Sequence, residues 1–226
     1  CRRCRTAAVI VVDDVGYSYG RGLPSVLDGF SASFPPGAVT AVTGGNGCGK
    51  TTLTKLIVGV LRPHKGRILV DGDDIAPLSL AEIGRRIGYL HQNPAHQLFC
   101  DTVAEEVAFG LRNLGLDDGE VDARLWHYLD YFDLAEYATD LPLDLSHGQR
   151  QRVMLAVVFS MRPAYVVLDE PTTGLDLVRR RALGAYMRGI VGRDGCGVIV
   201  VSHERSFIAR YADAEVRIDD LRGDGC

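Results

Sequence analysis

The chain has 226 residues, of which 46% are hydrophobic and 24% are charged, which suits one large globular domain or one domain with an inserted lobe. The formal net charge of −4 gives no overall basic field, so we expect no nucleic-acid partner. No uninterrupted apolar run reaches the roughly 18 residues needed to cross a bilayer, so any membrane role requires a partner.

Six scattered cysteines do not form a dense disulfide framework and favour a reducing, cytosolic setting. Cys1 and Cys4 form a C-x-x-C, which is half of a zinc site. No second pair or histidine cluster lies nearby in the sequence, so we assign no metal there.

The first part of the chain predicts short strands around one helix. Segment 8–19 is strand-rich with a turn, and segment 38–43 is a β-branched run that ends in glycines. Segment 51–61 has helical spacing, with its apolar residues on one face. Two more short strands follow at 66–72 and 86–90. Strands around a glycine loop indicate an α/β core.

From about residue 93 to residue 155 helical patterns dominate, as in TVAEEVAFGLRNL. Segments 164–169 and 197–202 are then continuous apolar runs, which are typical of strands buried on both faces of a parallel sheet. The pattern predicts an α/β core with a helical lobe inserted into it.

The segment Gly44–Thr51 satisfies G-x-x-x-x-G-K-[ST] between a predicted strand and a predicted helix. Its glycines let backbone N–H groups wrap phosphate oxygens, and the helix N-terminus adds a partial positive charge. Lys50 supplies a point charge for the outer phosphates, and Thr51 offers a hydroxyl to Mg²⁺. This context favours a phosphate loop over a chance glycine turn.

The apolar run Tyr165–Glu170 is expected to be a buried strand that ends in two carboxylates, Asp169 and Glu170. Asp169 at the strand end can hold Mg²⁺ through water, and Glu170 can polarise an attacking water. The alternative is that the two acids only cap a helix that follows the strand. The phosphate loop elsewhere in the chain disfavours this interpretation.

Further motifs resemble those of the nucleotide-binding subunits of ABC transporters, in family order and over nearly the whole chain. GGNGCGKTT resembles the Walker A motif and YVVLDE the Walker B motif; Tyr19 matches the adenine-stacking aromatic, Gln92 the Q-loop, Leu145–Gln149 (LSHGQ) the signature motif, Gly174–Asp176 the D-loop, and His203 the switch histidine. Position 147 departs from the usual LSGGQ, because it is His rather than Gly.

The resemblance implies an α/β P-loop NTPase core with a mainly parallel sheet, an N-terminal antiparallel β portion and an inserted α-helical subdomain. We expect a single ABC ATPase domain over 1–226, with residues 1–91 and 156–226 as the core. The helical subdomain, 92–155, carries the signature motif.

The resemblance also implies a head-to-tail dimer of two ATPase subunits that sandwiches two ATP molecules with Mg²⁺. Glu170 would be the catalytic base, His203 would hold the γ-phosphate and the attacking water, and Gln92 would sense the nucleotide. Mg²⁺ would be held by Thr51, Gln92 and Asp169. The residues expected to contact ATP are Tyr19, Gly44, Gly45, Asn46, Gly47, Cys48, Gly49, Lys50, Thr51, Thr52, Ser146, Gly148, Gln149 and Asp176.

A finer resemblance covers Gln92–Gly110, QNPAHQLFCDTVAEEVAFG, which is close to a pattern of energy-coupling factor (ECF) ATPases. Those proteins drive uptake of vitamins, cobalt or nickel. The resemblance implies that a transmembrane coupling subunit docks near Gln92, with the chain peripheral on the cytoplasmic face of the membrane.

Three alternatives stay open. An ordinary ABC importer or exporter cassette would share every ATP-site residue. A soluble ABC ATPase is disfavoured, because the stretch between Lys50 and Asp169 is too short for the long coiled coils of DNA-repair members. A cassette that binds ATP without hydrolysis is disfavoured by Glu170, Gln92 and His203 together.

Ser146 and Gln149 also fit the capping-box spacing S-x-x-Q before an apolar helix. A capped helix start is an anion site as well, and Gly148 keeps the approach free of a side chain. Cys48, beside Lys50, is either a thiol whose oxidation blocks ATP binding or a small residue that fills a tight loop, and we favour the second interpretation.

Overall fold

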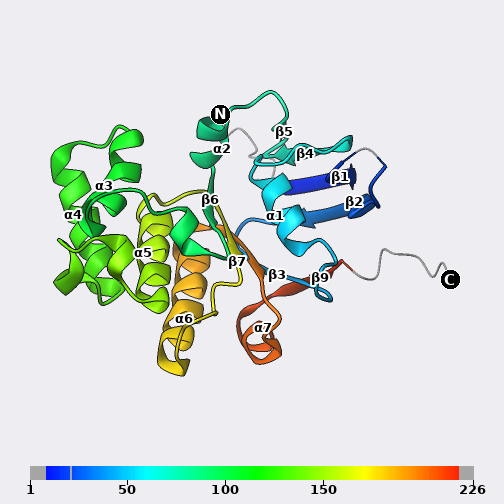
Figure 1. The fold of residues 1–226 in the computed structure, drawn as a ribbon. Coiled ribbons are helices and arrows are strands. Elements are labelled where there is room, and N and C mark those ends of the chain that lie inside the picture. Colours follow the sequence, from blue (N-terminus) through cyan, green and yellow to red (C-terminus); the bar gives the residue numbers. More distant parts are fainter. Residues whose placement is uncertain (1–8, 21, 219–226) are drawn as a thin grey trace, which may run out of the picture.

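The computed structural model describes residues 9–20 and 22–218, and Cys1 and Cys4 lie outside them. Two sheets and a group of helices make up the fold (Figure 1). Within the described residues, no helix is both long and apolar enough to span a membrane.

The larger sheet has five parallel strands in the order β6-β7-β8-β3-β9. Their bounds are Ile87–Leu90 (β6), Tyr165–Asp169 (β7), Gly197–Val201 (β8), Val39–Thr43 (β3) and Ala214–Arg217 (β9). Every residue of β7 and β8 is buried, which confirms the two continuous apolar runs as central strands.

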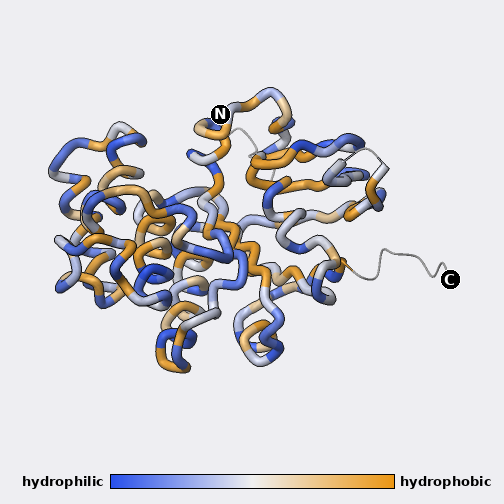
Figure 2. Tube along the Cα trace, in the orientation of Figure 1, coloured by the Kyte–Doolittle hydropathy of each residue, from blue (hydrophilic) through white to orange (hydrophobic). Residues whose placement is uncertain are grey.

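Alternate residues of these strands face two separate hydrophobic cores. Val166 and Leu168 pack into the core that includes the helical region, whereas Tyr165 and Val167 pack into the core beneath the second sheet. Figure 2 shows the hydrophobic residues concentrated along these central strands. Burial on both faces explains why the runs are apolar rather than alternating.

The smaller sheet is antiparallel, in the order β2-β1-β4-β5, as the resemblance implied. Its strands are Ile10–Tyr17 (β1), Leu27–Phe34 (β2), Lys65–Val70 (β4) and Asp73–Asp74 (β5). Its apolar face covers helix α1 (Lys50–Ile57). That helix ends earlier than the expected residue 61, since Gly59 takes a φ of +75°.

The helical region consists chiefly of α3, α4 and α5, which pack on one another through one hydrophobic core (Figure 1). The bounds are Val103–Asn113 (α3), Asp118–Tyr131 (α4) and His147–Ser160 (α5), with short 3-10 turns at Pro94–His96 (η1), Ala135–Tyr137 (η2) and Pro142–Asp144 (η3). Helix α5 continues through the expected boundary at residue 155, so one helix joins the lobe to the core.

Among residues 9–20 and 22–218 there are three further helices: Leu80–Gly84 (α2), Leu177–Asp194 (α6) and Arg205–Tyr211 (α7). Helix α6 connects β7 to β8, and α7 connects β8 to β9. These crossovers are the connections that parallel strands require.

Candidate functional site: a phosphate loop at the carboxyl edge of the parallel sheet

Part of the predicted site lies where the parallel strands end: the glycine loop, the Asp169–Glu170 pair and His203. Asp169 pairs with Val201 across β7 and β8, and Val201 pairs with Val42 across β8 and β3. The glycine loop therefore leaves the same edge of the sheet as the Asp169–Glu170 pair and the segment that carries His203. In open α/β sheets this edge is where ligands bind.

The glycine loop between β3 and α1 has the backbone that a phosphate cradle needs. Gly44, Gly47 and Gly49 have φ values of 146°, 77° and 109°, which L side chains rarely adopt. A Cβ on Gly49 would lie 2.9 Å from Cγ1 of Val26. The ammonium of Lys50 donates to the carbonyls of Gly44 at 2.9 Å and Gly45 at 2.7 Å, so it lies over the loop itself.

Cys48 is buried within this loop, and its Sγ lies 3.9 Å from the Lys50 ammonium. The burial agrees with a small residue that fills a tight loop, and it limits access of reagents to the thiol.

Asp169 is fully buried, and neither of its carboxylate oxygens has a hydrogen-bond partner. Its pKa is raised, above all because burial disfavours the charged form; the Thr51 side chain opposes the shift, and the Glu170 charge adds to it. A buried carboxylate without donors is costly unless a cation compensates it. The pair of Asp169 and the Thr51 hydroxyl therefore fits Mg²⁺, which prefers oxygen ligands.

Glu170 follows directly and is held in an unusual backbone conformation, with a φ of +53°. A non-glycine residue there costs about 1–3 kcal/mol and is typical of functional sites. Its Oε1 lies 3.0 Å from Nδ1 of His203, while its Oε2 is buried without a partner. The His203 side chain is 74% exposed, so this pair lies at the boundary between protein and solvent.

A cavity of about 700 Å³ opens beside this pair. It is lined at one side by Thr43, Gly44 and Gly45, and at the other by Ser202 and His203. The start of the glycine loop and the switch segment thus face the same space.

Tyr19 and Gln92 lie near the site with exposed side chains. Tyr19 is 57% exposed, and its hydroxyl lies 3.0 Å from Oγ1 of Thr52, in the first turn of α1. An exposed ring fixed beside the glycine loop can stack on a base. Gln92 comes just after β6, the strand that pairs with β7.

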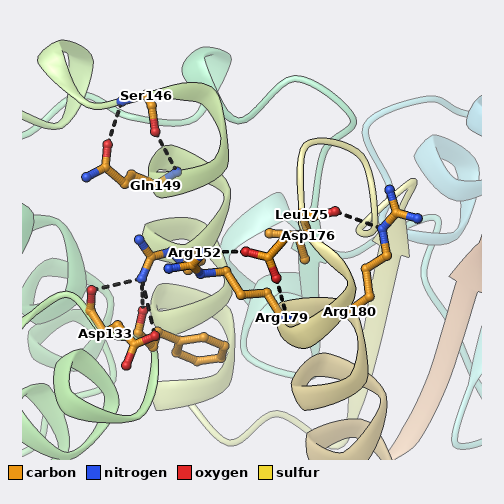
Figure 3. A network of polar contacts seen from close by, with 9 residues as sticks. Asp133, Ser146, Gln149, Arg152, Leu175, Asp176, Arg179 and Arg180 are labelled. Carbon is orange, nitrogen blue, oxygen red and sulfur yellow. Dashed lines mark hydrogen bonds and ion pairs between the residues drawn. The ribbon is translucent and has the colours of Figure 1, made fainter.

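The capping box predicted at the start of α5 is confirmed. Oγ of Ser146 accepts from the Gln149 N–H at 3.3 Å, and Oε1 of Gln149 accepts from the Ser146 N–H at 2.9 Å (Figure 3). The helix begins against the D-loop of its own chain: a Cβ on Gly148 would lie 2.8 Å from the carbonyl oxygen of Gly174. A Cβ on Gly174 would in turn lie 2.7 Å from Nδ1 of His147, the residue that departs from the family motif.

Asp176 acts as the N-cap of α6. Its Oδ1 accepts from the Arg179 N–H at 2.8 Å, and its Oδ2 pairs with the Arg179 guanidinium (Figure 3). The bond from the Arg179 N–H is the main reason that the pKa of Asp176 is lowered. This capping role was not anticipated, although an Asp before a helical segment is a known sign of it.

Two arginines near the starts of α5 and α6 make contacts that no sequence motif predicts. Nη1 of Arg152 donates to the Asp133 carbonyl at 2.8 Å, and Arg180 contacts both Leu175 and Glu204. A run of arginines on a helix gives no sign of which ones turn inward, so this information comes from the structure.

An apolar groove of about 610 Å³ lies between α2, β6, α3 and the end of α5. Its rim carries Phe99 and Phe109, which are 64% and 46% exposed and pack edge to face with centroids 4.9 Å apart. Glu106 beneath them is buried, and its Oε2 accepts from the N–H groups of Phe99 and Cys100 at 2.9 and 2.8 Å. The groove thus has a fixed floor and an exposed aromatic edge.

Comparison with known proteins identifies the family to which this chain belongs. The family model described as "ABC transporter" matches residues 27–173. A putative ABC transporter ATP-binding protein of Pyrococcus furiosus is 42% identical over 207 residues, which cover 91% of this chain and 78% of that protein.

An energy-coupling factor transporter ATP-binding protein, EcfA2, of Symbiobacterium thermophilum is 40% identical over 210 residues, covering 90% of this chain and 73% of its own length. Among solved structures, cbiO1 from Clostridium perfringens, part of the ABC transporter complex cbiONQ, superposes with a TM-score of 0.80 at 31% identity, covering 93% of this chain and 84% of that one. The chain belongs to the ABC transporter family of ATP-binding domains.

Proposed function

We propose that this chain binds ATP with Mg²⁺, hydrolyses the γ-phosphate and powers solute transport through a separate transmembrane partner. The observation that carries the proposal is the 3.0 Å contact between Glu170 and His203, beside the buried and unpartnered carboxylate of Asp169. Two acids with different surroundings at one phosphate site suit different tasks, one for the metal and one for water.

The roles follow from chemistry and position. Thr51, Asp169 and Gln92 would hold Mg²⁺, which neutralises phosphate charge when it is bound. Glu170 would accept a proton from the attacking water, and His203 would donate a hydrogen bond to the γ-phosphate. Lys50 would exchange the loop carbonyls for phosphate oxygens, which are charged and therefore stronger acceptors.

A second ATPase subunit would complete the site. The start of α5 lies with the helical region, apart from α1 in Figure 1. Helix geometry leaves the amides of His147 and Gly148 without intrahelical acceptors, which suits a phosphate from another subunit. We propose that Ser146, Gly148 and Gln149 contact ATP held by that subunit, either a second copy or a homologous chain.

The groove edged by Phe99 and Phe109 would receive the transmembrane coupling subunit. It is continuous with β6, so a helix seated there would lie close to Gln92. We propose an occupant with an apolar helical face, because amphipathic helices bury such faces in grooves. We propose that this subunit is of the ECF type and serves uptake of a vitamin, cobalt or nickel; a relative named as an energy-coupling factor transporter ATP-binding protein supports the ECF type.

Glu170→Gln tests the enzymatic part. The variant should retain ATP and lose hydrolysis, because the amide keeps the shape of the carboxylate but takes up no proton. Glu136→Gln, an exposed carboxylate on η2, is the matched control and should hydrolyse ATP normally. Unchanged turnover in Glu170→Gln would remove Glu170 from this role.

Co-purification from membranes tests the docking part. Phe99→Ser should release the membrane partner while ATP binding persists, and Trp126→Ser, which alters an exposed aromatic on α4, should release nothing. An ECF-type transmembrane protein in the complex would support uptake, whereas a two-domain permease would assign the chain to an ordinary importer or exporter. A complex with no membrane subunit would contradict the transport proposal.

A further inference from the structure

Arg180, near the start of α6, joins two loops that leave different strands of the parallel sheet. Its Nε donates to the carbonyl oxygen of Leu175 at 2.8 Å, and its Nη1 donates to Oε1 of Glu204 at 2.9 Å. Figure 3 shows the guanidinium turned back from the helix toward Leu175. The side chains of Arg180 and Glu204 are 36% and 25% exposed, so water screens this contact only in part.

Each of the two loops carries a residue of the proposed hydrolytic pair. Leu175 lies in the turn that follows Glu170, and Thr173 N–H donates to the Glu170 carbonyl within that turn. Glu204 directly follows His203, and its N–H donates to Oγ of Ser202. The His203 side chain is exposed, so its position depends on the backbone on either side of it.

We propose that Arg180 is a positioning residue for ATP hydrolysis. By binding Leu175 and Glu204 at once, it fixes the distance between the turn after Glu170 and the loop that presents His203, and so keeps Nδ1 of His203 on the Glu170 carboxylate. Arg180 acts through these two neighbours and needs no contact with nucleotide. The inference rests on the proposed function, in which Glu170 and His203 act on the same ATP.

The chemistry of the side chain fits this task. A guanidinium presents several N–H groups in a rigid plane, so Nε and Nη1 can bind acceptors that lie in different directions. Lysine offers a point charge on a flexible stem and would hold one acceptor better than two. If the Arg180–Glu204 contact were only a surface ion pair, its loss would change turnover little. A positioning role predicts a clear fall in kcat, so kinetics distinguish the two interpretations.

The test is a double-mutant cycle on the intact ATPase assembly, with Arg180→Ala, Glu204→Ala and the double variant. Misplacement of a catalytic group can cost up to about 100-fold in rate, and we expect each single change to lower kcat about tenfold, with KM for ATP within about twofold of the parent. The double variant should be no slower than the slower single variant, because both changes break one link.

Three further measurements separate positioning from folding. Arg180→Lys should restore part of kcat, and Arg181→Ala, which alters the exposed neighbouring arginine, should leave kcat unchanged. Unfolding in urea shows whether any rate loss follows from lost stability. An unchanged kcat in Arg180→Ala, rate losses that multiply in the double variant, or a loss that follows stability would each overturn the inference.

Glu170→Gln keeps the two proposals apart. If Glu170→Gln abolishes hydrolysis while Arg180→Ala leaves kcat intact, only the positioning inference fails. If Glu170→Gln itself turns over normally, the proposed function fails with it.

Discussion

Two capping boxes of the same design allow the structural and functional roles of the signature motif to be separated. Ser146→Ala removes the oxygen that accepts from the Gln149 N–H at 3.3 Å. Ser79→Ala removes the matching bond at α2, where Oγ of Ser79 accepts from the Glu82 N–H at 3.3 Å, and with it a bond that the same hydroxyl donates to Oε2 of Glu82 at 2.7 Å. Loss of such a cap costs about 1 kcal/mol, within a range of about 0.5–2.

In a chain of this size, about 1 kcal/mol lowers Tm by about 2–4 °C. Both variants should show this shift in a thermal melt and an equal fall in urea midpoint, with unchanged m-values. Because a typical domain is stable by about 5–15 kcal/mol, either variant stays almost wholly folded at 25 °C. If both serines act only as helix caps, both variants should therefore keep full ATPase activity.

The proposed contact with a second subunit's ATP predicts otherwise for one of them. Ser146→Ala should lose most of its steady-state hydrolysis, measured as phosphate release at saturating ATP, whereas Ser79→Ala should keep it. Equal activity in the two variants would refute the phosphate-binding role of Ser146. A loss of stability above about 4 kcal/mol would refute the reasoning from the cap, since caps do not contribute that much.

Other predictions concern single residues of the nucleotide site. Because burial raises the folded-state pKa of Asp169, its charge opposes folding above that pKa; the penalty shrinks as pH falls through the folded-state pKa and is gone below the unfolded value of about 4. Asp169→Asn with EDTA present should therefore melt higher than the parent at pH 7, with the gap closing in acid, and equal melting at pH 7 would contradict this. Tyr19→Ala should weaken ATP binding by about 0.5–1.5 kcal/mol in calorimetry, while Tyr19→Phe should bind almost normally, since stacking needs only the ring; equal losses in both would assign the effect to the hydroxyl. Gly49→Ala should abolish binding of a fluorescent ATP analogue, because its φ of 109° and the 2.9 Å approach to Val26 both exclude a Cβ, and retained binding would show that the loop can shift.

The sequence was most informative where one physical rule dominates. The apolar runs that became β7 and β8 could be predicted because strands buried on both faces have no polar positions. The box at Ser146 could be predicted because its two hydrogen bonds are local.

Elements that depend on partners distant in sequence were harder to predict. Strand β2, LDGFSASF, has a glycine and three consecutive small residues, and it forms because β1 pairs with it. Strand β9 is short, with three of its four residues exposed, and exists through its parallel pairing with β3. Local propensity is a weak guide for such strands.

The same distinction holds within the site. The glycine loop and the Asp169–Glu170 pair follow from spacing alone, whereas the left-handed backbone of Glu170 and the link from Arg180 to Glu204 depend on tertiary packing. The close approach of the His147 ring to Gly174, where a Cβ would lie 2.7 Å from Nδ1, likewise joins two motifs that are distant in sequence. No spacing rule indicates it.

The most direct test of the account places two defects in an assembled pair of ATPase subunits, either in one subunit or divided between the two. Lys50→Ala disables a glycine loop, and Ser146→Ala, or the corresponding serine change in a homologous partner, disables a signature motif. If each site takes these parts from different subunits, both defects in one subunit destroy both sites, whereas one defect in each leaves one site intact. We therefore expect ATP hydrolysis from the divided pair alone. Hydrolysis from the pair with both defects in one subunit, and none from the divided pair, would contradict the account.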